Sequence, residues 1–138
     1  MPTSDADVFF DTNVILYLLS GDSAKADRAE ELLSSGGTIS VQVLNEFASV
    51  ARRKLRMAWP EIHEVLTQVR AVCAVEPLSL DLHNRAMLIA ERYELSVYDS
   101  LIVAAALLAE CSTLFSEDMQ HGQVIDKALT IRNPFNVR

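Results

Sequence analysis

Residues 97 to 109 read VYDSLIVAAALLA and are almost entirely apolar after the aspartate. A helix that is apolar on every side has no face suited to water, so residues 98–109 are predicted to form a helix buried in the middle of a domain. A short β-prone run, residues 113–115, follows directly. A buried helix beside a strand indicates a layered α/β fold.

Around this helix, five β-prone runs alternate with segments that have helical spacing of their apolar residues. The predicted strands are 8–10, 38–41, 75–78, 113–115 and 129–132. The predicted helices are 13–20, 24–34, 42–56, 60–73, about 82–93 and 98–109. Strands separated by helices favour a parallel sheet covered on both faces. The expected fold is a three-layer α/β/α sandwich with a mainly parallel sheet of about five strands.

Length and composition favour one intracellular domain. The chain has 138 residues, half of them hydrophobic, which suits a single domain spanning 1–138. Cys73 and Cys111 lack metal-site or redox spacing and are expected to be reduced. The opening MPTSDADVFF has no basic residue before its short apolar run, unlike a secretory signal. The apolar run 101–109 is far shorter than the ~20 residues of a membrane span, so a cytoplasmic protein with no membrane association is expected.

The net charge of -7 argues against simple binding of nucleic acid, because phosphates are usually bound by Lys and Arg. Acidic residues that are gathered around cations weaken this objection. If four carboxylates bind metal ions, their negative charges make up more than half of the net charge of -7. The positive charge of the metal ions reduces the net charge further.

Two acidic residues follow strands, where an α/β sheet binds its ligands, and two more lie near helix starts. Asp11 ends the first strand in FFDTN, and Asp118 follows the fourth strand in TLFSED. Glu46 lies early in its helix and Asp99 opens the apolar helix. Ligands of such folds bind outside the carboxyl ends of the strands. Each acid also has a simpler explanation as a turn, cap or surface residue, and Glu117 is an alternative to Asp118.

Taken together, these acids match the requirements of metal-dependent phosphodiester hydrolysis. Mg²⁺ and Mn²⁺ prefer oxygen ligands and keep several waters, so such a site needs converging carboxylates and little else. In a two-metal site, one ion activates the attacking water and the other stabilises the leaving oxygen. No serine, cysteine or histidine nucleophile is required.

The stretches FFDTNVILYLL (9–19), QVLNEF (42–47), VYDSLIVAAA (97–106) and TLFSEDMQHGQVID (113–126) resemble, in order and spacing, the acidic motifs of the PIN-domain family. The likeness is greatest to the bacterial VapC-type toxin ribonucleases. It implies that Asp11, Glu46, Asp99 and Asp118 bind Mg²⁺ or Mn²⁺ and catalyse endonucleolytic RNA cleavage, leaving a 5'-phosphate and a 3'-hydroxyl.

The resemblance also assigns two supporting polar residues and two protein partners. Asn13 is expected to orient Asp11, and Ser116 to give polar support to the site. Many relatives have Thr where Ser116 stands. A small antitoxin protein and a second copy of the chain, forming a homodimer, are the partners that the resemblance implies.

Several other residues are candidates for contact with RNA. A basic cluster, formed by Arg52, Arg53, Lys54 and Arg56, lies just past Glu46 on the same predicted helix. It would bind phosphates beside the cut, or it is only the solvated end of a helix. Trp59 and Tyr98 are aromatic candidates for base stacking, with core packing as the alternative. His121 follows Asp118 closely enough to approach a substrate phosphate.

Other functions fit the sequence less well. The phosphohydrolase pattern D-x-D-x-[TV] fails at Asn13, which cannot act as a general acid. A receiver domain would need a lysine after a late strand, where this chain has Glu117 and Asp118. There is no phosphate-binding G-x-x-x-x-G-K-[ST] loop. The main alternative is a PIN fold that binds or processes RNA with weak or no nuclease activity.

Overall fold

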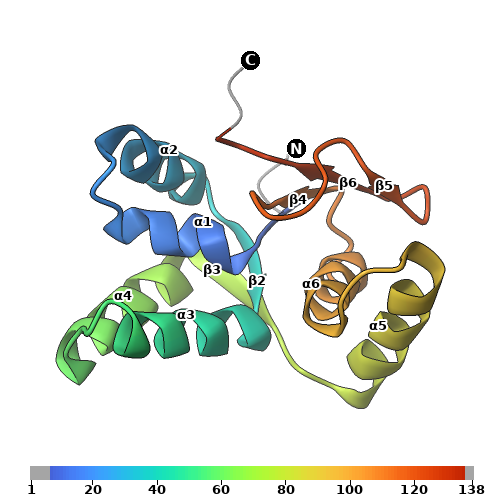
Figure 1. Cartoon of the computed structure of the whole chain (residues 1–138), viewed down its shortest axis with the longest axis horizontal. Coiled ribbons are helices and arrows are strands. Elements are labelled where there is room, and N and C mark those ends of the chain that lie inside the picture. The colour runs from blue at the N-terminus through green and yellow to red at the C-terminus, as the bar shows by residue number, and fades with distance from the viewer. Residues whose placement is uncertain (1–6, 136–138) are drawn as a thin grey trace.

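The computed structural model describes residues 7–135, which form a six-stranded sheet with helices on both faces (Figure 1). The strands are β1 (Val8–Phe10), β2 (Gly37–Ser40), β3 (Cys73–Glu76), β4 (Thr113–Phe115), β5 (Val124–Ile125) and β6 (Leu129–Arg132). The helices are α1 (Thr12–Leu16), the 3-10 turn η2 (Tyr17–Leu19), α2 (Ser23–Ser34), α3 (Val41–Arg53), α4 (Trp59–Val72), α5 (Leu80–Tyr93) and α6 (Val97–Leu108). Both ends of the predicted domain, 1–6 and 136–138, lie outside the described residues, as does most of the segment assessed as a signal.

The strand order is β3-β2-β1-β4-β6-β5, and every neighbouring pair is parallel except β5 with β6. From β1, the chain builds the sheet first toward β3 and then, after α6, toward β6. The order therefore reverses between β1 and β4, where the carboxyl ends of parallel strands form a crevice. The predicted α/β architecture with a mainly parallel sheet is confirmed.

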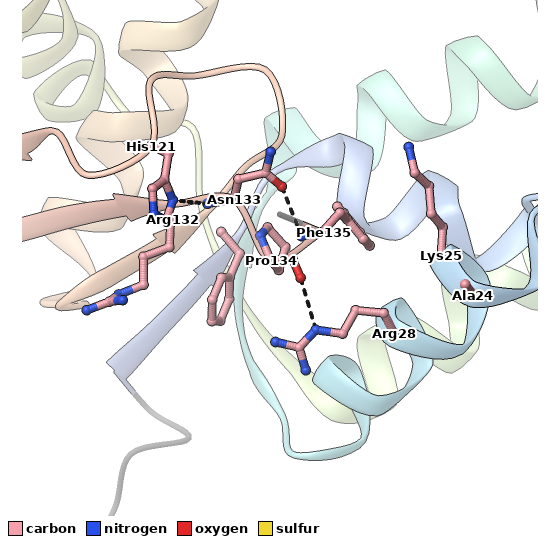
Figure 2. A pocket seen from close by; sticks show the side chains of 9 residues that line it. Ala24, Lys25, Arg28, His121, Arg132, Asn133, Pro134 and Phe135 are labelled. Carbon is pink, nitrogen blue, oxygen red and sulfur yellow. Dashed lines mark hydrogen bonds between the residues drawn. The ribbon is translucent and has the colours of Figure 1, made fainter. Parts of the chain in front are cut away.

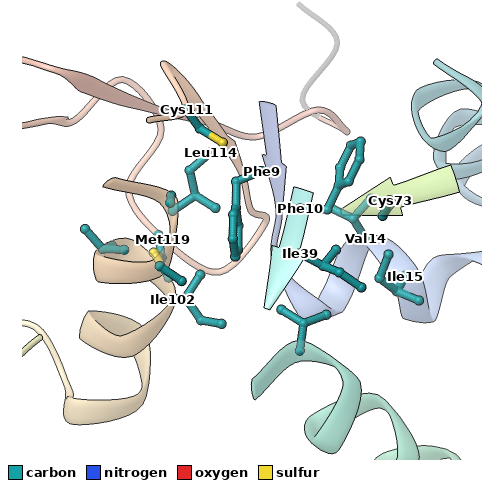
Figure 3. Packing of buried hydrophobic residues seen from close by; sticks show 14 of the residues in the cluster. Phe9, Phe10, Val14, Ile15, Ile39, Cys73, Ile102, Cys111, Leu114 and Met119 are labelled. Carbon is teal, nitrogen blue, oxygen red and sulfur yellow. The ribbon is translucent and has the colours of Figure 1, made fainter. Parts of the chain in front are cut away.

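The core lies on both faces of the central strands. Consecutive strand residues point to opposite faces, so Phe9 and Phe10 of β1 pack in different layers. Figure 3 shows Phe9 on the side of α6 with Ile102, and Phe10 on the opposite side with Val14. All four side chains are inaccessible to solvent or nearly so. Helix α6 is buried along most of its length, as its all-round apolar pattern predicts.

Local capping explains where several helices begin. Ser40, Ser79 and Ser96 each have extended backbone angles and accept a hydrogen bond from the backbone N–H three residues on. Such contacts satisfy donors that the first helical turn leaves unpaired.

Among residues 7–135, none of the helices combines the length and apolar character that crossing a bilayer requires.

The structure differs from the predicted elements in four places. The strand predicted at 75–78 is β3, which begins two residues earlier, because α4 already ends at Val72. The strand β5 was not predicted, because two residues are too few for an alternating pattern and it pairs only with β6. The predicted helix 13–20 is divided into α1 and η2. Helix α3 ends at Arg53 rather than at 56, and Arg56 adopts a left-handed φ of 56°.

Candidate functional site

A pocket of about 360 Å³ opens where the strand order reverses. Its lining combines the four predicted acids with polar, basic and apolar side chains. The lining residues are Asp11, Thr12, Asn13, Leu16, Glu46, Ser49, Val50, Arg53, Tyr98, Asp99, Ile102 and Asp118. The acids come from four segments that are far apart in the sequence: the end of β1, helix α3, the start of α6 and the loop after β4.

Asp11 is the buried acid of this pocket, with 6% of its surface exposed. It caps α1, and its Oδ1 accepts a hydrogen bond of 2.7 Å from the backbone N–H of Thr12. Its Oδ2 accepts one of 2.7 Å from the hydroxyl of Ser116. Burial raises the pKa of Asp11 to about 6; the two hydrogen bonds oppose this rise, and the negative charges of Glu46 and Asp118 add to it. A cation bound beside this carboxyl group would favour its ionised form and lower its pKa.

Glu46 is held by two hydrogen-bond donors that sequence reasoning did not assign to it. The hydroxyl of Thr12 donates to its Oε1 at 2.5 Å, and the amide of Gln42 donates to its Oε2 at 3.0 Å. Gln42 lies one helical turn before Glu46, a spacing that could have indicated the contact. Thr12 is 34 residues away, and no local pattern could have indicated that it reaches Glu46.

Asp99 lies in the first turn of α6, whose cap is Ser96. Burial raises the pKa of the Asp99 carboxyl; a hydrogen bond with Ser96 opposes this rise, and the charges of Asp118 and Glu46 add to it. The same two acids, Glu46 and Asp118, therefore raise the pKa values of both Asp11 and Asp99. The pocket concentrates negative charge, although its acids come from distant parts of the chain.

The neighbouring acids Glu117 and Asp118 point in different directions. Asp118 lines the pocket. Glu117 accepts a hydrogen bond from the hydroxyl of Tyr17 and forms an ion pair of 3.1 Å with Lys25 of α2. The structure therefore places Asp118, and not Glu117, beside the other three acids.

Asn13 makes a different contact from the one predicted. Its Oδ1 accepts a hydrogen bond of 3.2 Å from the backbone N–H of Glu117, and among residues 7–135 no hydrogen bond joins it to Asp11. Its Nδ2 is buried and has no hydrogen-bond partner within the described chain. Asn13 thus holds the loop that carries Asp118, because this loop passes over the start of α1.

The predicted basic cluster is divided by the end of α3. Arg53 lines the pocket, and its Nε donates to the hydroxyl of Ser49 at 3.1 Å. Arg52 instead stacks over Trp59, 5.3 Å from the ring centre, and donates to the carbonyl of Met57. The cluster members Lys54 and Arg56 do not line the pocket. Of the two aromatic candidates, Tyr98 lines the pocket and Trp59 does not.

The donor set of the pocket suits a hard divalent cation. Within residues 7–135, no three side chains of His, Cys, Asp or Glu stand close enough together to form a complete metal cage. Mg²⁺ does not need one, because it is usually bound by one or two carboxylates and keeps several waters. Burial is the main reason that the pKa values of Asp11 and Asp99 are raised, and the neighbouring acids add a repulsion that a cation would relieve. By this chemistry, the residues fit Mg²⁺ or Mn²⁺.

The fold and site define an α/β protein with a mostly parallel sheet and an acid-lined pocket at the switch point of that sheet. A family model described as the PIN domain matches residues 8–126, and the chain belongs to this family. The match spans all four acids of the pocket. No curated protein is a significant match to the sequence.

Solved structures with the same fold are bacterial toxins. The chain is similar to a toxin–antitoxin complex from Klebsiella pneumoniae, with 20% identity, TM-score 0.71 and coverage of 94% of this chain and 99% of the other. It is also similar to VapC20 of Mycobacterium tuberculosis, a toxin that cleaves the sarcin–ricin loop, with 22% identity, TM-score 0.65 and coverage of 80% and 91%. A third is VapBC2 of Rickettsia felis bound to a DNA fragment from its promoter, with 19% identity, TM-score 0.65 and coverage of 91% and 97%.

Proposed function

We propose that this chain is a metal-dependent endoribonuclease whose site consists of Asp11, Glu46, Asp99 and Asp118. The observation that carries the proposal is the convergence of these acids, from four separate segments, in one pocket at the switch point of the sheet. Burial raises the pKa values of Asp11 and Asp99, and the like charges of the neighbouring acids add to this energetic cost. Divalent cations bound between the acids would offset this cost, because they attract all four carboxylates.

In this proposal, the four acids hold one or two Mg²⁺ or Mn²⁺ ions. When bound, such ions lower the pKa of a water and neutralise charge on the phosphate. Ser116 and Thr12 fix the carboxylate of Asp11, while Thr12 and Gln42 fix that of Glu46. Groups held in place before substrate binds need no reorganisation during the reaction.

Two further side chains of the pocket would contact the RNA itself. Arg53 supplies a positive charge beside the acids and would bind the phosphate being cut or its neighbour. Tyr98 is mostly exposed at the rim, where its ring is free to stack on an unpaired base. Cleavage would leave a 5'-phosphate and a 3'-hydroxyl.

We further propose that the protein is the toxin of a cytoplasmic toxin–antitoxin pair. The support is the shared fold of the Klebsiella, Mycobacterium and Rickettsia toxins, which covers nearly the whole length of each of those chains. The partners would be an RNA substrate, a small antitoxin protein and a second copy of the chain. The competing proposal, an RNA-binding module without activity, has less support because all four acids line the pocket.

RNA cleavage by the purified protein tests the proposal. The parent is expected to cut RNA with Mg²⁺ or Mn²⁺ and to be inactive in EDTA, while Asp99→Asn and Asp118→Asn should lose at least about 100-fold in rate, the scale of an electrostatic catalytic contact. Glu117→Gln should retain most of the activity, because that side chain lies outside the pocket.

Asp81→Asn is the matched control for Asp99→Asn. Asp81 also lies in the first turn of a helix, but it is exposed and away from the pocket. Folded Asp99→Asn protein that cuts RNA as fast as the Asp81→Asn control would disprove the site assignment. Sequencing of RNA 5' ends after induced expression of the parent and of Asp99→Asn would identify the target.

A further inference from the structure

A second pocket, of about 500 Å³, lies beside the acid-lined one and is rich in basic side chains (Figure 2). It is formed by the start of α2, the last residues of β4 and β6, and the segments 121 and 133–135. Because β4 and β6 are parallel, their ends lie on the same edge of the sheet as Asp11. We call it the basic pocket; its lining is Ala24, Lys25, Arg28, Phe115, His121, Arg132, Asn133, Pro134 and Phe135.

The basic pocket gathers positive charge in a chain whose net charge is -7. Figure 2 shows Arg28 and Arg132 on two different elements, on either side of Pro134, with the side chain of Arg132 extending away from Arg28. Within residues 7–135, the guanidinium of Arg132 has no ion pair or hydrogen bond. Arg28 donates from its Nε to the carbonyl of Pro134 at 3.1 Å and pairs with the exposed Glu31. Neither contact neutralises it strongly, because the carbonyl is uncharged and an exposed ion pair is weak. Two guanidinium groups that flank a pocket suit a phosphate.

The remaining lining suits the rest of a nucleotide. Phe115 and Phe135 supply apolar aromatic surface against which a base can pack. Nδ1 of His121 accepts a hydrogen bond of 2.9 Å from the backbone N–H of Asn133, so the proton of the neutral ring lies on Nε2, where it can donate to a phosphate oxygen. Pockets that bind small ligands usually span roughly 300 to 1,000 Å³, which includes this volume.

One short loop separates the two pockets. Its residue Asp118 lines the acidic pocket, while the preceding residue Glu117 binds Lys25 of the basic pocket at 3.1 Å. A strand of RNA whose cut phosphate lies at the acids would therefore bring its neighbouring nucleotides to the basic pocket.

We infer that the basic pocket binds a nucleotide flanking the cut, and that the arginines of its lining, Arg28 and Arg132, attract the phosphates of this RNA. This inference rests on the proposed ribonuclease function for its substrate, but it concerns binding and not cleavage. The pocket thereby contributes affinity for single-stranded RNA and fixes which phosphate reaches the acids.

Binding of a fluorescent single-stranded RNA, measured by anisotropy in EDTA across a series of salt concentrations, tests the inference without cleavage. Arg132→Gln should raise Kd severalfold and reduce the salt dependence, the slope of log Kd against log salt, by about 0.7 for the lost phosphate contact. Arg132→Lys should restore much of that slope. The matched control is Arg70→Gln, an exposed arginine of α4 outside both pockets, which should bind as the parent does.

The inference is wrong if folded Arg132→Gln and Arg28→Gln both bind RNA with the Kd and salt slope of the Arg70→Gln control. It is also wrong if the Arg132 variants weaken binding of an acidic peptide but not of RNA, since the pocket would then serve a protein partner. Should Arg132→Gln unfold, Arg28→Gln alone gives the same comparison. Parent protein that binds RNA through these arginines but never cuts it would contradict the nuclease proposal and leave this inference standing.

Discussion

Asp11 shows most clearly how the burial of a single residue couples folding to pH. Its carboxyl group is buried, receives two hydrogen bonds and lies near two other acids. Burial outweighs the hydrogen bonds, so the folded protein favours the protonated form, with a pKa of about 6 instead of 3.8. A folded-state pKa above the unfolded one stabilises the fold at low pH, and this contribution is lost as the pH rises through about 6.

Asp11→Asn should therefore flatten the pH dependence of stability in metal-free protein. The difference between pKa values of 3.8 and about 6 corresponds to about 3 kcal/mol in the free energy of unfolding. The parent should lose this stability between about pH 4 and pH 7, while the variant, which cannot ionise, should not. Urea denaturation in EDTA at several pH values measures both proteins.

The same experiment with Mn²⁺ provides the control. If the acids bind metal as proposed, Mn²⁺ should stabilise the folded parent at neutral pH and stabilise Asp11→Asn much less. Parallel pH profiles for parent and variant in EDTA would show that burial of Asp11 does not govern stability.

At the scale of elements, the junction of α2 and β2 shows how glycines place a strand. Gly36 has a left-handed φ of 82°, and its N–H bonds to the carbonyl of Leu33, which ends the helix. Gly37 begins β2 where the ring of Phe10 approaches its Cα. The sequence predicts a helix that ends at residue 34, just before this glycine pair, but the second glycine is required because of packing against β1.

Gly37→Ala should destabilise the protein. An added Cβ would lie 2.6 Å from Cε2 of Phe10 and 2.9 Å from Cγ2 of Val8, and the buried Phe10 ring has little room to move. Overpacking of this kind costs about 1 to 3 kcal/mol in the free energy of unfolding, measurable by urea denaturation. Gly21→Ala is the control, because nothing lies within 4 Å of its added Cβ. Equal stability of the two variants would refute the packing argument.

At the scale of the whole molecule, the outer face of α5 is the apolar surface that most needs an explanation. Leu80 and Leu88 are the most exposed large hydrophobic residues within 7–135, at 74% and 65%. Their spacing of eight residues places them on one side of the helix. The homodimer expected from the family resemblance would give this face a partner, since exposed apolar patches commonly mark interfaces.

The expected outcome is that the parent elutes as a dimer and the Leu80→Glu, Leu88→Glu double variant as a monomer, with mass measured by light scattering. The melting temperature of the isolated fold should change little, because neither side chain is part of the core. Val72→Glu, on the exposed end of α4, serves as the control and should remain dimeric. A dimeric double variant would exclude the α5 face as the interface.

The sequence by itself determined the features that depend on residues close together in the chain. Apolar spacing located the helices, the all-round apolar pattern placed α6 in the interior, and strands separated by helices predicted the parallel sheet. The order of four acidic motifs also predicted which acids would meet. These signals are readable because a helix or strand repeats every two to four residues.

Only the tertiary structure decided which way individual polar groups point. Glu117 turns away from the acids because Tyr17 and Lys25 hold it, and these residues lie 100 and 92 positions earlier in the chain. The donors around Glu46 and the assembly of the basic pocket likewise depend on segments joined only by folding. No local pattern encodes such contacts, since their geometry is set by the packing of α1 and α2 against the sheet edge.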